Sequence, residues 1–293
     1  MKDGYSGDGT RKAPADQPRL TRLGHELPDP KPRGLFRRKP IETTPDLNED
    51  GSPRLRVVPA PEPRARVETG DDWAALRSVP AVCADPGADV TASFDMLRTR
   101  LARQLAEQGW NRVAVVAPTG GCGATFTAVH LALSFARLPG QRALLMDLNQ
   151  RRPGAAAMLG VRGHGDLRGF LVGRAPVQDH VVRLGDTLAA GFVQAADPDG
   201  PALLHGQRAA LALGTAMDRL APDVMICDLP PMLESDDLLA ILPQVDGVLL
   251  VADGHQTRPG HIAACERQLA GQTRVLGVAL NQALRAGPAP AQA

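Results

Sequence analysis

Lysine is nearly absent from this sequence of 293 residues: the only four lysines are Lys2, Lys12, Lys31 and Lys39, and every later basic residue is arginine. Tyrosine is represented by Tyr5 alone, and aromatic residues make up 3% of the chain. Neither positive nor negative charge is in excess, because the sequence has 33 Lys+Arg and 32 Asp+Glu. A net charge of +1 lacks the concentrated positive field that phosphate backbones attract, so we expect no nucleic-acid partner.

Long apolar runs and paired cysteines are missing as well. No stretch reaches the roughly 18 consecutive apolar residues of a membrane helix, and the polar start of the sequence lacks the apolar core of a signal peptide. The four cysteines form no CxxC pair, which is typical of reduced thiols; they are Cys83, Cys122, Cys227 and Cys265. These absences predict a cytoplasmic protein.

The first part of the chain differs in composition from the rest. Residues 1–66 hold 11 of the 26 prolines and 14 Lys+Arg against 10 Asp+Glu, with little apolar periodicity. We therefore predict a disordered tail over 1–75, a domain over 76–288 and a short disordered end over 289–293. Within the tail, residues 33–39 set Leu35 and Phe36 among four basic residues. Such a segment suits peripheral contact with the inner membrane or with a partner, but a solvated linker is the simpler interpretation.

The pattern after residue 90 is that of alternating helices and strands. Phe94, Leu97, Leu101 and Leu105 recur at helical spacing, with Thr91 or Ser93 as the expected N-cap and Gly109 as the end. Short apolar runs predict buried strands at 113–117, 143–146, 224–227, 248–252 and 275–280. Helical composition separates them, as at 124–138 and 208–220. The expected fold class is α/β, a doubly wound and mostly parallel sheet with helices on both faces.

Three glycine-rich or polar segments follow predicted strands, where such folds bind their ligands. Residues 118–125, with three glycines before a helix, have the composition of a loop that holds phosphate through backbone N–H groups. A tight turn explains them equally well. Asp147 and Asp228 each end a buried strand and could hold a metal-bound water or activate a nucleophile. The alternative for both is an Asp that caps the following segment.

In this order the three segments resemble the bacterial tyrosine kinase family of capsule and exopolysaccharide synthesis. That family is a branch of the deviant P-loop ATPases, which include partitioning and division-site ATPases. The resemblance covers roughly residues 91 to 284. It consists of Ala117–Thr125 as the Walker A loop, Asp147 with Arg151-Arg152-Pro153 as the second Walker motif, Asp228–Pro231 followed by Asp236 as Walker B, and 246–251 and 277–281 as the last two strands.

The resemblance implies ATP or ADP and Mg²⁺ as cofactors. The residues it assigns to the nucleotide are Gly121, Cys122, Gly123, Ala124, Thr125 and, as the usual adenine contact, Asn281. It assigns Mg²⁺ to Thr125, Asp147 and Asp228, and in an active enzyme it gives the two aspartates a part in catalysis. The partner it implies is a membrane polysaccharide co-polymerase or export protein, present as a separate chain.

Several positions depart from the family pattern, and they cluster on the phosphate side. Ala124 stands where the family has the lysine that reaches the β- and γ-phosphates, and Asn149 replaces the second acid of the second Walker motif. Gly120 and Cys122 replace the family's Pro and Glu. A hydrogen bond to a charged group contributes about 1.5–3 kcal/mol, so loss of the lysine should weaken nucleotide binding roughly 10- to 150-fold.

Two further departures concern phosphorylation and assembly. The sequence ends without the tyrosine cluster that family members autophosphorylate. Residues 93–100 resemble the family's oligomerisation helix, but of its Glu and two Arg only Arg98 remains, with Ala92 and Asp95 at the other positions. The ring-shaped oligomer of the family is therefore in question.

The preferred hypothesis is a kinase-inactive regulator or scaffold of exopolysaccharide or capsule biosynthesis. The alternative is an active ATPase or tyrosine kinase that acts on a partner. A partitioning-type ATPase fits less well, because those proteins carry a signature lysine near the start of the loop, where this sequence has Pro118-Thr119. Two residues keep alternatives of their own: His130 as a packed histidine or a ligand, and Cys122 as a packed or a reactive thiol.

Overall fold

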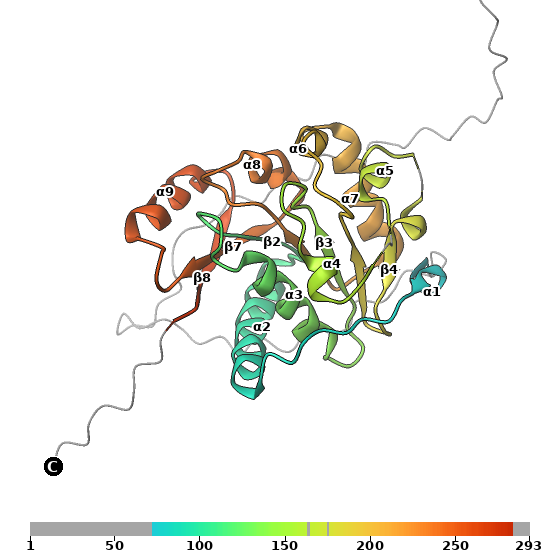
Figure 1. Ribbon diagram of the computed structural model, residues 1–293, viewed down its shortest axis with the longest axis horizontal. Helices are drawn as coiled ribbons and strands as arrows, with labels where there is room; N and C mark the ends of the chain where they lie inside the picture. The colour runs from blue at the N-terminus through green and yellow to red at the C-terminus, as the bar shows by residue number, and fades with distance from the viewer. Residues whose placement is uncertain (1–71, 163–164, 175, 284–293) are drawn as a thin grey trace, which may run out of the picture. The chain divides into compact units, whose positions relative to one another are not determined.

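The structure, a computed structural model, describes residues 72–162, 165–174 and 176–283 and consists of one sheet between two layers of helices (Figure 1). The strands are β1 (Arg77–Ser78), β2 (Arg112–Val116), β3 (Ala143–Asp147), β4 (Val181–Arg183), β5 (Leu188–Gly191), β6 (Val224–Asp228), β7 (Gly247–Asp253) and β8 (Arg274–Asn281). Their order in the sheet is β1-β4-β5-β3-β6-β2-β7-β8. All pairs are parallel except β4 with β5. The five predicted strands are confirmed.

Helices cover both faces of this sheet. They are α1 (Asp72–Ala75), α2 (Ala88–Gln108), α3 (Ala124–Ala136), α4 (Ala155–Met158), α5 (Leu167–Leu171), α6 (Gly200–Leu204), α7 (Gln207–Leu220), α8 (Asp237–Ile241) and α9 (Pro259–Leu269), with 3-10 turns η1 (Val177–Asp179) and η2 (Leu242–Gln244). One apolar core joins α2, α3 and α4 to the sheet, and the other joins α1, α5, α7, α8 and α9 to the opposite face. The predicted α/β class with both faces covered is confirmed.

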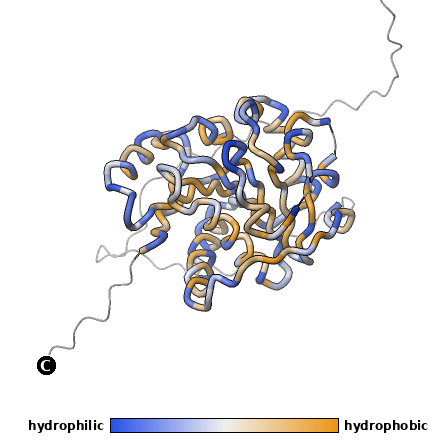
Figure 2. The backbone as a smooth tube through the Cα atoms, viewed as in Figure 1, coloured by the Kyte–Doolittle hydropathy of each residue, from blue (hydrophilic) through white to orange (hydrophobic). Residues whose placement is uncertain are grey.

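Burial of the central strands explains their sequences. Every residue of β3, β6 and β7 is buried, so these strands have no polar face and read as continuous apolar runs. Figure 2 shows the hydrophobic colouring along the strands at the centre and hydrophilic colouring in the surrounding loops. Among the described residues no helix combines the length and apolar character needed to cross a bilayer.

Two predicted boundaries differ from the structure. Residues 72–75, assigned to the tail, form α1, where Trp73 is buried, donates a hydrogen bond to the carbonyl of Asp186 and lies under the guanidinium of Arg142. The helix expected from Thr91 or Ser93 begins earlier, at Ala88 after Gly87. The expected N-cap was wrong, because the Ser93 hydroxyl bonds to the Asp89 carbonyl within the helix. Segments 1–71 and 284–293, including residues 33–39, lie outside the described residues.

Candidate functional site

The loop between β2 and α3 is shaped by two glycines. Gly121 and Gly123 adopt φ of 84° and 87°, a left-handed conformation that other residues rarely accept. Among the described residues none accepts a hydrogen bond from the backbone N–H groups of 121–125. These donors therefore stay free at the N-terminus of α3, a helix of 13 residues, where the helix dipole also favours an anion.

Ala124 is the first residue of α3, so a methyl group stands where the resemblance expects a lysine ammonium. The four lysines of the sequence all precede residue 40, and the described residues contain none. The loop thus offers backbone dipoles and helix polarity to an anion, without a lysine to neutralise its charge.

Asn281 reaches the loop from the end of β8. Its Nδ2 donates a hydrogen bond to the carbonyl of Cys122 at 3.0 Å, and a side chain at position 123 would require Asn281 to move. The residue that the resemblance assigns to the adenine base thus also holds the loop in position. Its contact with a base stays a prediction.

Asp147 and Asp228 are brought together by the sheet. They are register partners at the ends of the neighbouring parallel strands β3 and β6, and both are fully buried. Asp147 accepts backbone N–H bonds from Asn149 at 3.1 Å and Ala155 at 3.3 Å. Among the described residues none lies in hydrogen-bonding geometry to either oxygen of Asp228, although the Thr125 hydroxyl and the Leu229 backbone are near enough to oppose the rise in its pKa. The three residues predicted for Mg²⁺ therefore meet at one edge of the sheet.

Burial controls the protonation of this acid pair. It raises the pKa of Asp147 from 3.8 to about 7, against the opposing effect of backbone N–H groups at Ala155, Asn149 and Gly154. Burial and the neighbouring Asp147 also raise the pKa of Asp228 well above its ordinary value. A pair of buried carboxyls without a cation favours retaining a proton, or accepting a metal ion that would supply the missing positive charge.

The arginines after β3 do not both face the loop. Arg151 forms an ion pair with Asp237, at 3.2 Å from Nη2 to Oδ1, and the Asp237 side chain is fully buried. Arg152 instead extends toward Gly120, where a side-chain Cβ would stand 3.1 Å from its Nη1. Arg151 therefore has a structural partner, whereas Arg152 places a guanidinium at the loop.

The segment after β6 contributes a residue that the sequence analysis missed. Backbone bonds from Met232 to the Ala117 carbonyl and from Leu233 to the Pro118 carbonyl hold this segment along the loop. Glu234 then accepts the N–H of Gly120 through Oε1 at 2.7 Å. A signal was present, because a glycine at 120 supplies an N–H that the family's proline lacks.

Cys122 and His130 are both packed side chains. The Cys122 sulfur is buried between the hydroxyls of Thr119 and Thr257, each at 3.6 Å, which favours a packed thiol. The His130 ring lies 5.3 Å from the Phe94 ring and 4.3 Å from the Phe126 ring, measured between centroids. Burial lowers the pKa of His130, with Arg137 adding to the effect. The packed interpretation of His130 is confirmed.

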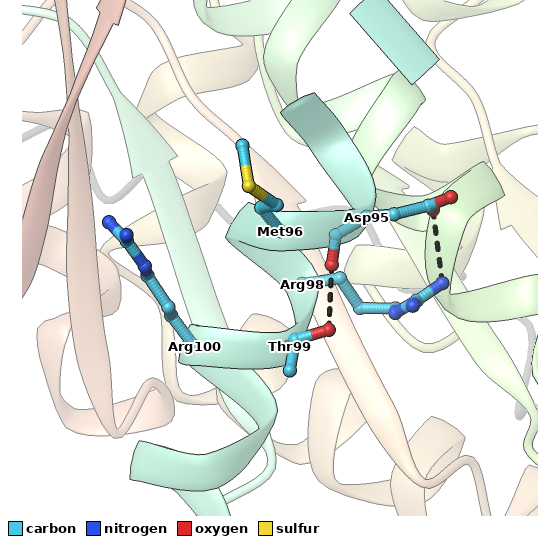
Figure 3. A pocket seen from close by; sticks show the side chains of 5 residues that line it. All are labelled: Asp95, Met96, Arg98, Thr99 and Arg100. Carbon is cyan, nitrogen blue, oxygen red and sulfur yellow. Dashed lines mark hydrogen bonds and ion pairs between the residues drawn. The ribbon is translucent and has the colours of Figure 1, made fainter. Parts of the chain in front are cut away.

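The helix expected to resemble the family's oligomerisation helix uses its charged residues within the chain. Arg98 Nη1 bonds to Asp95 Oδ1 and to the Ser134 carbonyl, both at 3.0 Å, and so ties α2 to α3. Figure 3 shows Asp95 and Arg98 joined, with Met96 and Arg100 directed elsewhere around a depression of about 320 Å³. No residue of the 118–125 loop lines this depression.

Comparison with known proteins finds similarity to proteins named as tyrosine kinases. No family model matches the chain. It is 28% identical over 195 residues to "Putative tyrosine-protein kinase EpsB" of Ralstonia nicotianae, and 28% identical over 190 residues to the protein of that name from Ralstonia solanacearum. The crystal structure of the VpsO kinase domain matches with a TM-score of 0.59 and 25% identity, over 67% of this chain and 96% of that one. The chain is thus similar in sequence to proteins named putative tyrosine-protein kinases and in structure to the kinase domain of VpsO.

A second solved structure supports the same fold, and the matches to the curated relatives cover only a part of those proteins. The kinase domain of Escherichia coli tyrosine kinase ETK matches with a TM-score of 0.60 and 23% identity, over 68% of this chain and 79% of that domain. The matches to the two Ralstonia proteins cover 64% and 63% of this chain but only 25% and 24% of their own lengths. The chain therefore spans about a quarter of these relatives.

Proposed function

We propose that this protein is a kinase-inactive relative of the bacterial tyrosine kinases that acts by binding, as a regulator or scaffold in exopolysaccharide or capsule biosynthesis. Its partner in this proposal is a membrane co-polymerase or export protein on a separate chain. We also infer a cytoplasmic location, with residues 33–39 as a peripheral membrane contact. Unchanged co-sedimentation with anionic vesicles after deletion of residues 31–40 would contradict that contact.

The observation that carries the proposal is Ala124 at the start of α3. Phosphoryl transfer depends on positive charge that neutralises the charge developing on the transferred group. Here residues 118–125 contain no basic side chain, Arg151 is paired with Asp237, and of the two arginines after β3 it is Arg152 that extends toward the loop, at Gly120. Asp147 and Asp228, at the neighbouring strand ends, are acids and contribute no positive charge on the side where phosphate charge would develop.

The residues present still fit a nucleotide with Mg²⁺. The N–H groups of 121–125 have no acceptor among the described residues. Thr125 and Asp228 lie near one another, and Asp147 lies beside Asp228 at the same edge of the sheet. In a loaded site, the loop would bind phosphate, Asn281 would face the base, and Thr125, Asp147 and Asp228 would hold the metal ion. Bound Mg²⁺ would neutralise phosphate charge. The chain's own residues thus support binding better than transfer.

The proposal is tested with purified protein, Mg-ATP and an added tyrosine-containing polypeptide. We expect no phosphotyrosine signal from the wild type. Ala124→Lys should raise nucleotide affinity roughly 10- to 150-fold. Ala124→Gln is the matched control, because it adds length and hydrogen-bonding atoms without charge. Robust phosphorylation by the wild type would contradict the proposal, and equal gains from Lys and Gln would show that charge is not what the loop lacks.

An active ATPase or kinase is the second candidate, favoured by the meeting of Thr125, Asp147 and Asp228 at one strand edge. For such an enzyme, we expect phosphate release from ATP that disappears in both Asp147→Ala and Asp228→Ala. Phosphate release that persists in these variants would instead indicate a contaminating activity.

A further inference from the structure

We propose that Glu234 determines which nucleotide this site prefers, by disfavouring a nucleoside triphosphate relative to a diphosphate. The inference rests on the part of the proposed function in which the loop binds a nucleotide. Glu234 belongs to none of the motifs that the sequence analysis assigned, and its carboxylate lies directly against the loop.

Glu234 is held at the loop by the backbone around it. Met232 and Leu233 bond to the carbonyls of Ala117 and Pro118, and Glu234 Oε1 then accepts the Gly120 N–H at 2.7 Å. Three hydrogen bonds in neighbouring residues thus fix a carboxylate at the first turn of the loop. The Gly120 N–H is already occupied by an anionic group of the protein, unlike the N–H groups of 121–125.

The sheet order indicates which end of a nucleotide Glu234 would meet. Asn281, assigned to the base, lies at the end of β8, whereas Asp147 and Asp228, assigned to Mg²⁺, lie at the ends of β3 and β6. Because β2 and its loop lie between these strands, a bound nucleotide would cross the loop from the β8 side toward β6. Glu234, which follows β6, therefore stands on the side of the terminal phosphate.

Charge at this end of the loop is nearly balanced before any ligand enters. Around the position of a Cβ on Gly120, Arg152 Nη1 lies at 3.1 Å and both Glu234 carboxylate oxygens at 3.6 Å. The guanidinium attracts a phosphate, and the carboxylate offsets it. A triphosphate brings more negative charge to this end than a diphosphate does, so the carboxylate opposes the triphosphate more strongly.

An independent feature points to a ligand at the same edge. Both oxygens of Asp228 are buried and accept no hydrogen bond from the described residues, and the Thr125 hydroxyl beside them belongs to the first turn of α3. Buried polar atoms without partners are uncommon in folded proteins, and a bound cation is one arrangement that would satisfy them. Glu234 would therefore act on a site that has a place for the metal ion of a metal–nucleotide complex.

The test is calorimetric titration of the full chain with Mg-ADP and Mg-ATP. The wild type should bind Mg-ADP more tightly. Glu234→Gln keeps an oxygen for the Gly120 N–H but removes the charge, so it should raise Mg-ATP affinity about 3- to 10-fold and Mg-ADP affinity less than about 2-fold. The matched control is Glu107→Gln, which removes the same charge at the end of α2, next to the opposite edge of the sheet. Circular dichroism melting checks that each variant folds.

Each outcome decides the inference. Equal gains for both nucleotides, or no change, would show that Glu234 only positions the loop and would overturn its role in selectivity. That role is also overturned if neither nucleotide binds the wild type, Glu234→Gln or Glu234→Ala, although the kinase-inactive proposal would still stand. Phosphotyrosine formed by the wild type would overturn that proposal and leave the ADP-to-ATP affinity ratio as the separate test of Glu234.

Discussion

A partly exposed carboxylate, Asp95 on α2, and a buried pair, Asp147 and Asp228 at the sheet edge, have contrasting surroundings. Asp95 Oδ1 accepts hydrogen bonds from Ser134 Oγ at 2.5 Å, Arg137 Nη2 at 2.6 Å and Arg98 Nη1 at 3.0 Å. At the sheet edge, Asp147 and Asp228 lie side by side, fully buried, and no described residue forms an ion pair with either.

The difference shows how surroundings decide what a carboxylate does. The Ser134 hydroxyl, together with Arg137 and Arg98, holds the pKa of Asp95 below its ordinary value, so this group stabilises the fold as an anion. Burial raises the pKa values of Asp147 and Asp228, so these groups resist ionisation. A buried acid pair that costs stability is more readily explained by a binding role than by packing.

The largest expected effect comes from neutralising the acid pair. Because the pKa of Asp147 is about 7 in the native state and 3.8 ordinarily, the native state holds a proton that the unfolded chain has released. This contribution to stability is complete below pH 3.8 and is lost as pH rises through about 7. Asp147→Asn should therefore be more stable than the wild type at pH 8, by about 2–3 kcal/mol after allowing for a weakened acceptor.

Urea unfolding at pH 5 to 8, in the presence of a chelator, measures this gain as a difference between the two proteins. His130 and His180, whose pKa values burial lowers, contribute equally to both and cancel. Asp228→Asn is the second variant, since it breaks no hydrogen bond to Asp228, and its gain should have the same sign. A loss of stability at pH 8 in both variants would mean that the pair is compensated by a cation in the native state.

An opposite sign is expected for the partly exposed carboxylate. Asp95→Ala removes the acceptor shared by Ser134, Arg137 and Arg98, and should destabilise the protein by about 1–2 kcal/mol at pH 7. The loss should persist in part at high salt, because Arg98 is only 14% exposed and keeps an unpaired charge. Urea unfolding at low and high salt tests this. A stabilised Asp95→Ala variant would remove the contrast between the two groups.

The sequence predicts the central sheet well because its strands are buried on both faces. β2, β3, β6, β7 and β8 all match predicted apolar runs. β5, with the sequence Leu-Ala-Ala-Gly, has no β-branched or aromatic residue, and β4 has only three residues. Their strand state depends on pairing with each other and with β3, which local sequence does not encode.

The residues of the candidate site likewise include some that the sequence predicts and some that it does not. The glycine loop, Asp147 and Asp228 could be predicted because strand ends and glycine spacing are local signals. Glu234 and the pairing of Arg151 with Asp237 depend on how the segments after β3 and β6 approach the loop, so sequence spacing did not reveal them. The Asp95 network joins α2 to α3 across 39 residues and is equally a product of tertiary packing.

The smallest expected effect separates the two arginines that share Asp95 Oδ1. Arg137 is 46% exposed, so Arg137→Ala should cost about 0.5 kcal/mol or less, and this cost should vanish at high salt. Arg98→Ala should cost more, because Arg98 also bonds to the carbonyl of Ser134. Urea unfolding of both variants and of the double variant gives their coupling.

Arg137 also adds to the lowering of the His130 pKa, so an NMR titration of Arg137→Ala should show that pKa raised while remaining below 6.5, since burial is its larger cause. An unchanged His130 titration would show that Arg137 acts on Asp95 alone.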